Sequence, residues 1–354
     1  MRRKFSGYRR YTILFKFIMF APALGPTLSG LIVDGLTWRW LFFIVIPFAI
    51  FSIVFAAIYL KNVSEVTRPK VDVLSILLST IGFGGIVFGF SSAGESAEGW
   101  SSPAVYITLA LGFLSLALFV WRQLRVEEPM LDLRAFLSPM FTLTTILLVI
   151  MMMSLFSTMI ILPLFLQGAL ALSAYAAGLA LLPGGILNGM MSPIAGRLFD
   201  RFGPRMLVIP GTAILVFVMW MFTNVSSTTS TITFIVLHSI LMIGISLVMM
   251  PGQTNGLNQL PRKYYPHGTA ILNTLQQVAG AIGVALFISI MSAGQAGYLR
   301  GLENPENPVN QAEALTAGVQ SAFTGGLVFA IAAFILSLFI KKSVSPDDAF
   351  QHSS

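Results

Sequence analysis

The side chain best suited to acid–base chemistry in this sequence is His238, which lies inside the apolar run 231–250. An imidazole titrates near neutral pH, so a histidine placed there could exchange protons. A lone histidine in such a run could equally make a hydrogen bond to a neighbouring backbone carbonyl. The fourteen Asp and Glu residues lie outside the apolar runs or, for Asp34, at the end of one. His238 is therefore the candidate for proton handling, and both interpretations stay open.

Other chemistries lack the residues that they need. The chain has no cysteine, and its other two histidines, His267 and His352, are far apart in the sequence. These facts exclude disulfides and thiolate metal sites, and the histidines show no metal-ligand spacing. The sequence also shows no Ser/His/Asp set and no pair of acids within an apolar run. We therefore expect no enzyme activity, no metal and no cofactor.

The composition is that of a protein embedded in a lipid bilayer. Hydrophobic residues make up 56% and charged residues 10% of the chain, and the mean hydropathy is +0.83. Both values lie far outside the range of soluble globular proteins. In a chain this apolar, the net charge of +7 indicates basic cytoplasmic loops, so we expect no nucleic-acid partner.

About ten segments are long and apolar enough to span a membrane as helices, which need roughly 20 residues each. Their apolar runs are continuous, unlike the alternating strands of a membrane β-barrel. The predicted fold is therefore all-α, a polytopic membrane helix bundle. The expected spans are residues 14–34, 38–60, 73–92, 104–122, 140–162, 175–195, 206–223, 231–250, 269–291 and 321–340.

The distribution of basic residues predicts the orientation. If the N-terminus is cytoplasmic, all but Arg39 and Arg300 of the 21 Lys and Arg residues fall in cytoplasmic segments. Cytoplasmic loops of membrane proteins carry such an excess. Both termini are then cytoplasmic, and 292–320 is the longest outer loop, which we expect to be solvated. The segment 122–138 mixes charged with apolar residues and should lie along the inner membrane surface.

Small residues and a proline characterise the run 20–34. Ala21, Gly25 and Gly30 permit a neighbouring backbone to come close, because small residues drive helix pairing in lipid. Pro26 removes one helical hydrogen bond and bends the axis. These residues alone predict a kinked and tightly packed membrane helix.

The same run, as APALGPTLSG over 21–30, resembles the antiporter motif on the fifth helix of the major facilitator superfamily. The sequence WRWLFFIVIP that follows at 38–47 resembles the start of the sixth helix in the fourteen-helix, EmrB/QacA-like drug:proton antiporters. Within this group, the residues of these motifs are most similar to those of the lincomycin-resistance-like branch. Ser29 stands where the family usually has glycine, and Val45 where it usually has asparagine, which puts the fine packing in doubt.

A second motif, GRLFDRFGPR, covers residues 196–205. It resembles the cytoplasmic-loop motif of the superfamily, in the copy that belongs to the C-terminal half. A generic short basic turn is the alternative interpretation. The resemblance implies a latch that breaks and reforms during transport, with the carboxylate of this loop near the positive end of the next helix. The implied latch residues are Gly196, Asp200, Arg201, Gly203 and Arg205.

A third stretch, residues 268–283, resembles the penultimate helix of the same exporter group. Gly280 and Gly283 are expected to be packing contacts. Polar side chains at this depth must find partners or line a wet cavity, and both outcomes stay open. Together with soft apolar side chains, which suit promiscuous binding, they give the candidates for the substrate cavity: Met153, Phe156, Asn188, Asn273, Gln276 and Gln277.

The resemblance implies proton-driven export of amphipathic drugs or antibiotics across a bacterial plasma membrane, with protons as the coupling ion. Gly25, Pro26 and Gly30 would seal helix packing on the outer side, so that drug leaves without proton leak. The matching small surface would be Gly189 and the Pro183-Gly184-Gly185 kink on the 175–195 helix. The partners are then a small amphipathic drug, protons and lipid.

The resemblance starts near Phe17, at the fifth helix of the family, so four N-terminal family helices are expected to be absent. Fourteen family helices less these four leaves ten, which agrees with the ten expected spans. The chain then divides into a remnant of the N-terminal half (1–60), two inserted helices with a linker (61–138), a six-helix C-terminal half (139–342) and a tail (343–354). Self-association or a complementing chain would restore transport. The alternatives are an inactive remnant, an interaction partner of a full-length exporter, or a metabolite symporter of the same fold, which the antiporter motif disfavours.

Overall fold

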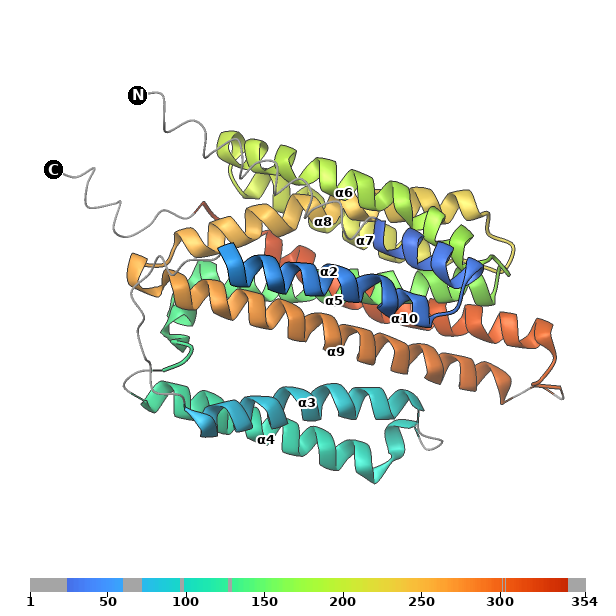
Figure 1. Cartoon of the computed structure of the whole chain (residues 1–354), viewed down its shortest axis with the longest axis horizontal. Helices are drawn as coiled ribbons and strands as arrows, with labels where there is room; N and C mark the ends of the chain where they lie inside the picture. The colour runs from blue at the N-terminus through green and yellow to red at the C-terminus, as the bar shows by residue number, and fades with distance from the viewer. Residues whose placement is uncertain are drawn as a thin grey trace.

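The computed structural model describes residues 24–59, 72–95, 99–126, 129–300, 302 and 304–342. In these ranges, nine helices are long and apolar enough to cross a membrane, and they run alternately back and forth along one long axis (Figure 1). A shorter helical segment covers residues 24–35. The nine helices are α2 (Arg39–Tyr59), α3 (Val73–Glu95), α4 (Pro103–Arg125), α5 (Pro139–Gly168), α6 (Ala174–Phe202), α7 (Arg205–Phe222), α8 (Thr231–Asn258), α9 (Tyr265–Leu299) and α10 (Pro308–Ser337).

These helices confirm the predicted all-α membrane fold. Each of the nine expected spans from 38–60 onward coincides with one of them. The remaining span, 14–34, begins before the first described residue. Ala21 and the tail 343–354 lie outside the described residues. The expectation of four absent N-terminal helices is not tested by the described part of the chain, and it stays a prediction.

The predicted long loop 292–320 is wrong, because most of it is helical. The α9 helix continues to Leu299, and α10 begins at Pro308. Asn307 caps α10 by accepting a hydrogen bond from the Val309 backbone N–H at 3.0 Å, and proline is well suited to the first helical position that follows. The Tyr298 hydroxyl donates to the Glu313 carboxylate at 2.5 Å across the connection. The connection between α9 and α10 is therefore short, and this hydrogen bond joins the two helices next to it.

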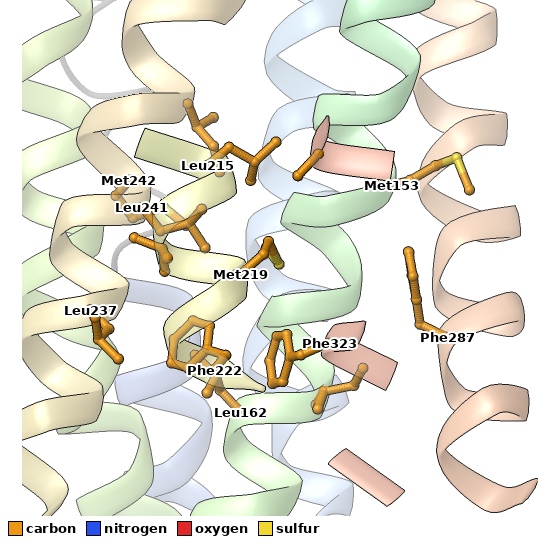
Figure 2. Close-up of a cluster of buried hydrophobic side chains, with 14 of the residues drawn as sticks. Met153, Leu162, Leu215, Met219, Phe222, Leu237, Leu241, Met242, Phe287 and Phe323 are labelled. Atoms are coloured by element: carbon orange, nitrogen blue, oxygen red, sulfur yellow. The ribbon is translucent and has the colours of Figure 1, made fainter. Parts of the chain in front are cut away.

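Helices α5 to α10 share one apolar core (Figure 2). Phe222 of α7 stacks on Phe323 of α10 with ring centroids 4.6 Å apart, and Phe165 of α5 meets Phe234 of α8 at 5.2 Å. Aromatic pairs in such contact contribute beyond their buried area. By contrast, α2 has no buried residue within the described structure, which is the expected state of a helix with lipid around it.

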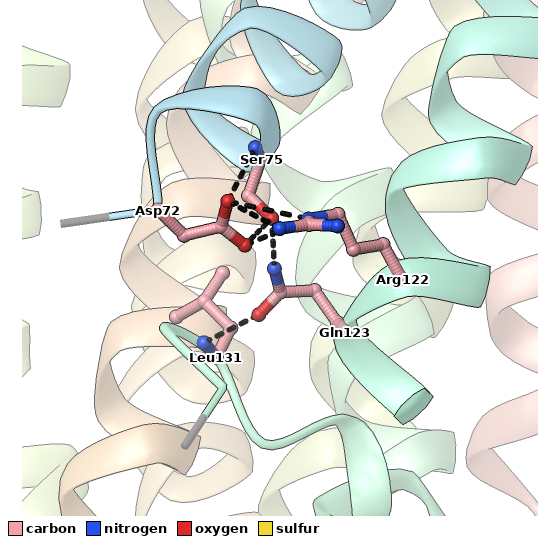
Figure 3. A network of polar contacts seen from close by, with 5 residues as sticks. All are labelled: Asp72, Ser75, Arg122, Gln123 and Leu131. Atoms are coloured by element: carbon pink, nitrogen blue, oxygen red, sulfur yellow. Dashed lines mark hydrogen bonds and ion pairs between the residues drawn. The ribbon is translucent and has the colours of Figure 1, made fainter. Parts of the chain in front are cut away.

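Helices α3 and α4 form an antiparallel hairpin beside α9 (Figure 1). Asp72 directly precedes α3 and forms an ion pair with Arg122 of α4 at 2.9 Å. The Asp72 carboxylate also accepts from the Ser75 hydroxyl at 2.5 Å. The buried Gln123 amide donates to the Ser75 hydroxyl at 2.7 Å and accepts from the Leu131 backbone N–H at 3.1 Å. This cluster (Figure 3) fixes the hairpin and the start of the following linker.

The linker after α4 packs inward. The α4 helix extends to Arg125, and a short 3₁₀ helix, η2 (Leu133–Leu137), precedes α5. The apolar side chains of the linker, Leu131, Leu133 and Phe136, pack against a buried cluster that includes Phe141 and Ile271. The predicted location of 122–138 along the inner membrane surface is not tested by these contacts, and it stays a prediction.

The Asp72 cluster makes a prediction about pH. The hydrogen bonds from Arg122 and Ser75 hold the pKa of Asp72 below its usual range. Its stabilising effect is therefore complete above the ordinary carboxyl pKa of about 3.9 and disappears only as the pH falls through the lowered value. We expect Asp72→Asn to lower the melting temperature measurably at pH 7, and this difference to shrink only at pH well below 4.

Melting in detergent, followed by intrinsic fluorescence at several pH values, measures this difference. Glu306→Gln, in the exposed connection between α9 and α10, is the control and should leave the melting temperature unchanged. A difference between wild type and Asp72→Asn that vanishes between pH 7 and 5 would contradict the assignment.

Candidate functional site

The helical segment 24–35 lies against the start of α6 at backbone distance. A Cβ placed on Gly30 would lie 2.9 Å from Tyr175 Cα and closer still to the Ala174 carbonyl. On the facing helix, a Cβ placed on Gly178 would lie 2.6 Å from the Pro26 carbonyl oxygen. Real Cβ atoms do not come that close to backbone, so neither position has room for a side chain. Gly30 and Gly178 together form a glycine crossing.

Hydrogen bonds between the two helices reinforce the glycine crossing. The Thr27 hydroxyl donates to the Gly178 carbonyl at 3.0 Å. The Asp34 carboxylate accepts from the Ala174 backbone N–H at 3.2 Å and from the Tyr175 N–H at 2.9 Å. Asp34 thus supplies a negative charge and acceptors to the N-terminus of α6, where free N–H groups need partners. The sequence placed Asp34 at the end of an apolar run, but it did not indicate that the N-terminus of α6 would be its partner.

The predicted partners of the 20–34 run need correction in two places. A Cβ placed on Gly25 meets nothing within 4 Å of the described atoms, unlike one on Gly30. Gly184, expected to face this run, instead lies against His238 and Met242 of α8. The crossing point on α6 is Ala174 to Gly178, before the Pro183 kink, because Asp34 ties the segment to the first turn of α6.

A cavity of about 570 Å³ lies between α3, α5 and α9. It brings together two of the predicted cavity residues, Phe156 of α5 and Gln277 of α9, with Val87 and Ser91 of α3. Its volume falls in the range of roughly 300–1,000 Å³ that is typical of sites for drug-sized ligands. The α3 residues were not among the sequence-based candidates, because nothing in the sequence predicts which helix the hairpin packs against.

The other predicted cavity residues lie elsewhere. The Asn188 amide donates to the Met242 carbonyl at 3.4 Å, and the Ser246 hydroxyl donates to the Asn188 carbonyl at 3.3 Å, so Asn188 ties α6 to α8. Asn273 is exposed, and the buried Gln276 Nε2 has no hydrogen-bond partner in the described structure. Met153 is buried against α9. None of these four lines the 570 Å³ cavity.

The two glycines of the 268–283 stretch are packing contacts, as predicted. A Cβ placed on Gly283 would lie 2.6 Å from Met153 Cα. One placed on Gly280 would lie 2.7 Å from a ring carbon of Phe156. The first contact is with backbone and the second with a side chain, and together they set the close approach of α5 and α9.

His238 lies in α8 and is 3% exposed. Its imidazole packs against Gly184 of α6, where a Cβ would meet the ring. Its Nδ1 has no hydrogen-bond partner among the described residues. The sequence-based alternative, a hydrogen bond from the imidazole to a neighbouring carbonyl, is therefore not made through Nδ1 in the described structure.

The 196–205 loop forms a tight turn between α6 and α7. Gly203 adopts φ of +77°, a conformation that favours glycine, and a Cβ on Gly196 would lie 3.2 Å from Met250 of α8. Asp200, Arg201 and Arg205 are exposed, and within the described ranges none of them takes part in an ion pair. The interaction of Asp200 with the positive end of α7 and the latch as a whole stay predictions.

A bundle of apolar helices that are long enough to cross a membrane defines a multi-pass membrane protein. Residues 9–284 match the model of the Major Facilitator Superfamily, and the chain belongs to that family.

Relatives in bacteria are similar over most of the chain. The lincomycin resistance protein LmrB of Bacillus subtilis (strain 168) is 57% identical, over 92% of this chain and 68% of that protein. The protein of the same name in Listeria monocytogenes serovar 1/2a is 58% identical, over 92% and 69%. An uncharacterized MFS-type transporter, YcnB of Bacillus subtilis, is 43% identical, over 93% and 68%.

Proposed function

We propose that this protein exports amphipathic antibiotics, lincomycin among them, across the bacterial plasma membrane. The observation that carries the proposal is the glycine crossing, supported by the 57% identity to a lincomycin resistance protein. Family transporters work by moving helices against each other around a central site, and a crossing without side chains permits close sealing. The antiporter motif, of which Gly30 and Pro26 are part, favours export over symport. We also propose the fourteen-helix group and cytoplasmic termini.

Protons are the proposed coupling ion. His238 is the proposed proton-handling residue of this chain, because it is a buried titratable side chain whose Nδ1 has no partner among the described residues. A buried polar group without a partner is costly in a membrane, so such residues are commonly functional. The exposed loop residues Asp200, Arg201 and Arg205 are proposed to form the latch in another conformation of the transport cycle.

The test is drug susceptibility in a bacterial host that lacks its own exporters. We expect expression of the chain to raise the inhibitory concentration of lincomycin severalfold. Because export is proposed to be driven by protons, an uncoupler should stop it. His238→Gln should shift the pH dependence of export while leaving the protein in the membrane.

A host whose susceptibility does not change, despite membrane-inserted protein, would contradict drug export. It would favour a remnant or an interaction partner instead. Export in His238→Gln with an unchanged pH profile would remove this residue from coupling, without removing drug export itself.

A further inference from the structure

One wall of the 570 Å³ cavity comes from the inserted hairpin. Val87, Ser91 and Gly94 of α3 line it, and their spacing of four and three residues places them on one face of the helix. The opposite wall comes from α5 and α9. The hairpin is therefore part of the cavity and not only an addition at the edge of the bundle.

The α3 helix is held in place near both ends, so this wall has a defined position. Towards its C-terminal end, a Cβ on Gly94 would lie 3.1 Å from Ser289 Cα, which shows that α3 and α9 approach closely there. At the other end, the Asp72 cluster joins α3 to α4 and to the linker (Figure 3). The linker in turn reaches α9, because the Asp132 backbone N–H donates to His267 Nδ1 at 3.3 Å.

The lining of the cavity indicates what it could hold. Phe156 and the aliphatic residues give an apolar surface, and Ser91, Gln277 and Ser292 add hydroxyl and amide groups. Every lining side chain that the structure describes is uncharged. A few neutral polar groups on a mainly apolar wall recognise a ligand by hydrogen bonds and shape, with no fixed charge to pair with.

We propose that α3 is a specificity-determining wall of the drug site. The ligand is an amphipathic molecule whose hydroxyl or amide groups meet Ser91, Gln277 and Ser292, while its apolar part lies against Phe156 and Val87. This inference deepens the proposed export function and rests on it. It assigns the inserted hairpin a direct part in choosing the substrate.

Two neighbouring residues of α3 give a matched pair of variants. Val87 lines the cavity, whereas Phe88 is 63% exposed on the outer face of the same helix. Val87→Trp fills part of the cavity, and we expect it to lower the resistance to lincomycin roughly tenfold. Phe88→Trp should leave resistance at the wild-type level. Equal resistance in wild type and Val87→Trp, at equal membrane levels, would overturn the inference.

Cysteine labelling tests the wall without relying on export or on a large side chain. Because the natural chain has no cysteine, single replacements are labelled at one site by a membrane-permeant maleimide. We expect lincomycin to slow the labelling of Val87→Cys and Ser91→Cys roughly tenfold in the purified protein. The labelling of Phe88→Cys should not respond to the drug.

The two experiments separate the two claims. If even the wild-type chain gives no resistance in the host, the export function is contradicted. The labelling experiment then still tests whether α3 lines a drug-binding cavity. Drug protection of Gln277→Cys without protection of Val87→Cys or Ser91→Cys would keep the cavity and overturn the role of α3. Protection at none of these positions would overturn the inference as a whole.

Discussion

Gly30→Ala is expected to abolish drug resistance, although it adds a single methyl group. That methyl would lie against the Ala174 carbonyl and 2.9 Å from Tyr175 Cα, and both are backbone atoms that no rotamer change can move. The helical segment 24–35 must therefore move away from α6, which also breaks the bonds from Ala174 and Tyr175 to Asp34. Overpacking of this kind costs about 1–3 kcal/mol. The lost seal at the glycine crossing then ends export.

Gly25→Ala, in the same helical segment, is the matched control for this prediction. A Cβ there meets nothing within 4 Å in the described structure, so resistance should stay at the wild-type level. Both variants are compared by inhibitory concentration and by the amount of protein in the membrane. Gly30→Ala with full resistance, or equal loss in the two variants, would contradict the crossing.

Gly283→Ala is expected to prevent the close packing of α5 and α9. Its added methyl would lie 2.6 Å from Met153 Cα and 2.9 Å from the Met153 carbonyl oxygen. Because the obstacle is again backbone, shortening a side chain should not help. We expect a melting temperature lower by roughly 2–4 °C or more, taking a cost of at least about 1 kcal/mol and a cooperative unit of about 200 residues, the six helices that share the apolar core.

Gly280→Ala provides the contrast, because its obstacle is the ring of Phe156. We expect its melting temperature to be lowered as well, and the double variant Gly280→Ala with Phe156→Leu to recover most of the loss. Adding Phe156→Leu to Gly283→Ala should give no such recovery. Recovery in both cases, or in neither, would show that the α5–α9 contact is not built in this way.

Much of the fold could be predicted from the sequence, because each span is an apolar run of sufficient length and the basic residues mark one end. The error at 292–320 has a simple cause. Residues 309–320, VNQAEALTAGVQ, are too polar to signal a membrane span, but most of them (Ala, Glu, Gln and Leu) are good helix formers. Asn307-Pro308 serves as a cap for α10 and not as a turn.

The candidate site was predicted only in part, for reasons that concern helix packing. Glycine spacing indicates that close contacts exist, but it does not say which glycine faces which helix. Gly30 and Gly178 meet, whereas Gly184 packs against His238. The wall that α3 adds to the cavity depends on where the hairpin docks, and the contacts that fix it, such as Gly94 with Ser289, join residues far apart in the chain.

Proton-driven drug export by this chain is tested by drug uptake into inside-out membrane vesicles that contain it. With an acidic interior generated by respiration, we predict that labelled lincomycin accumulates in these vesicles above the level of vesicles without the protein. We also predict that an uncoupler releases the drug and that Gly30→Ala vesicles do not accumulate it. Equal lincomycin levels in vesicles with and without the wild-type chain, with the protein present in the membrane, would contradict drug export by this chain.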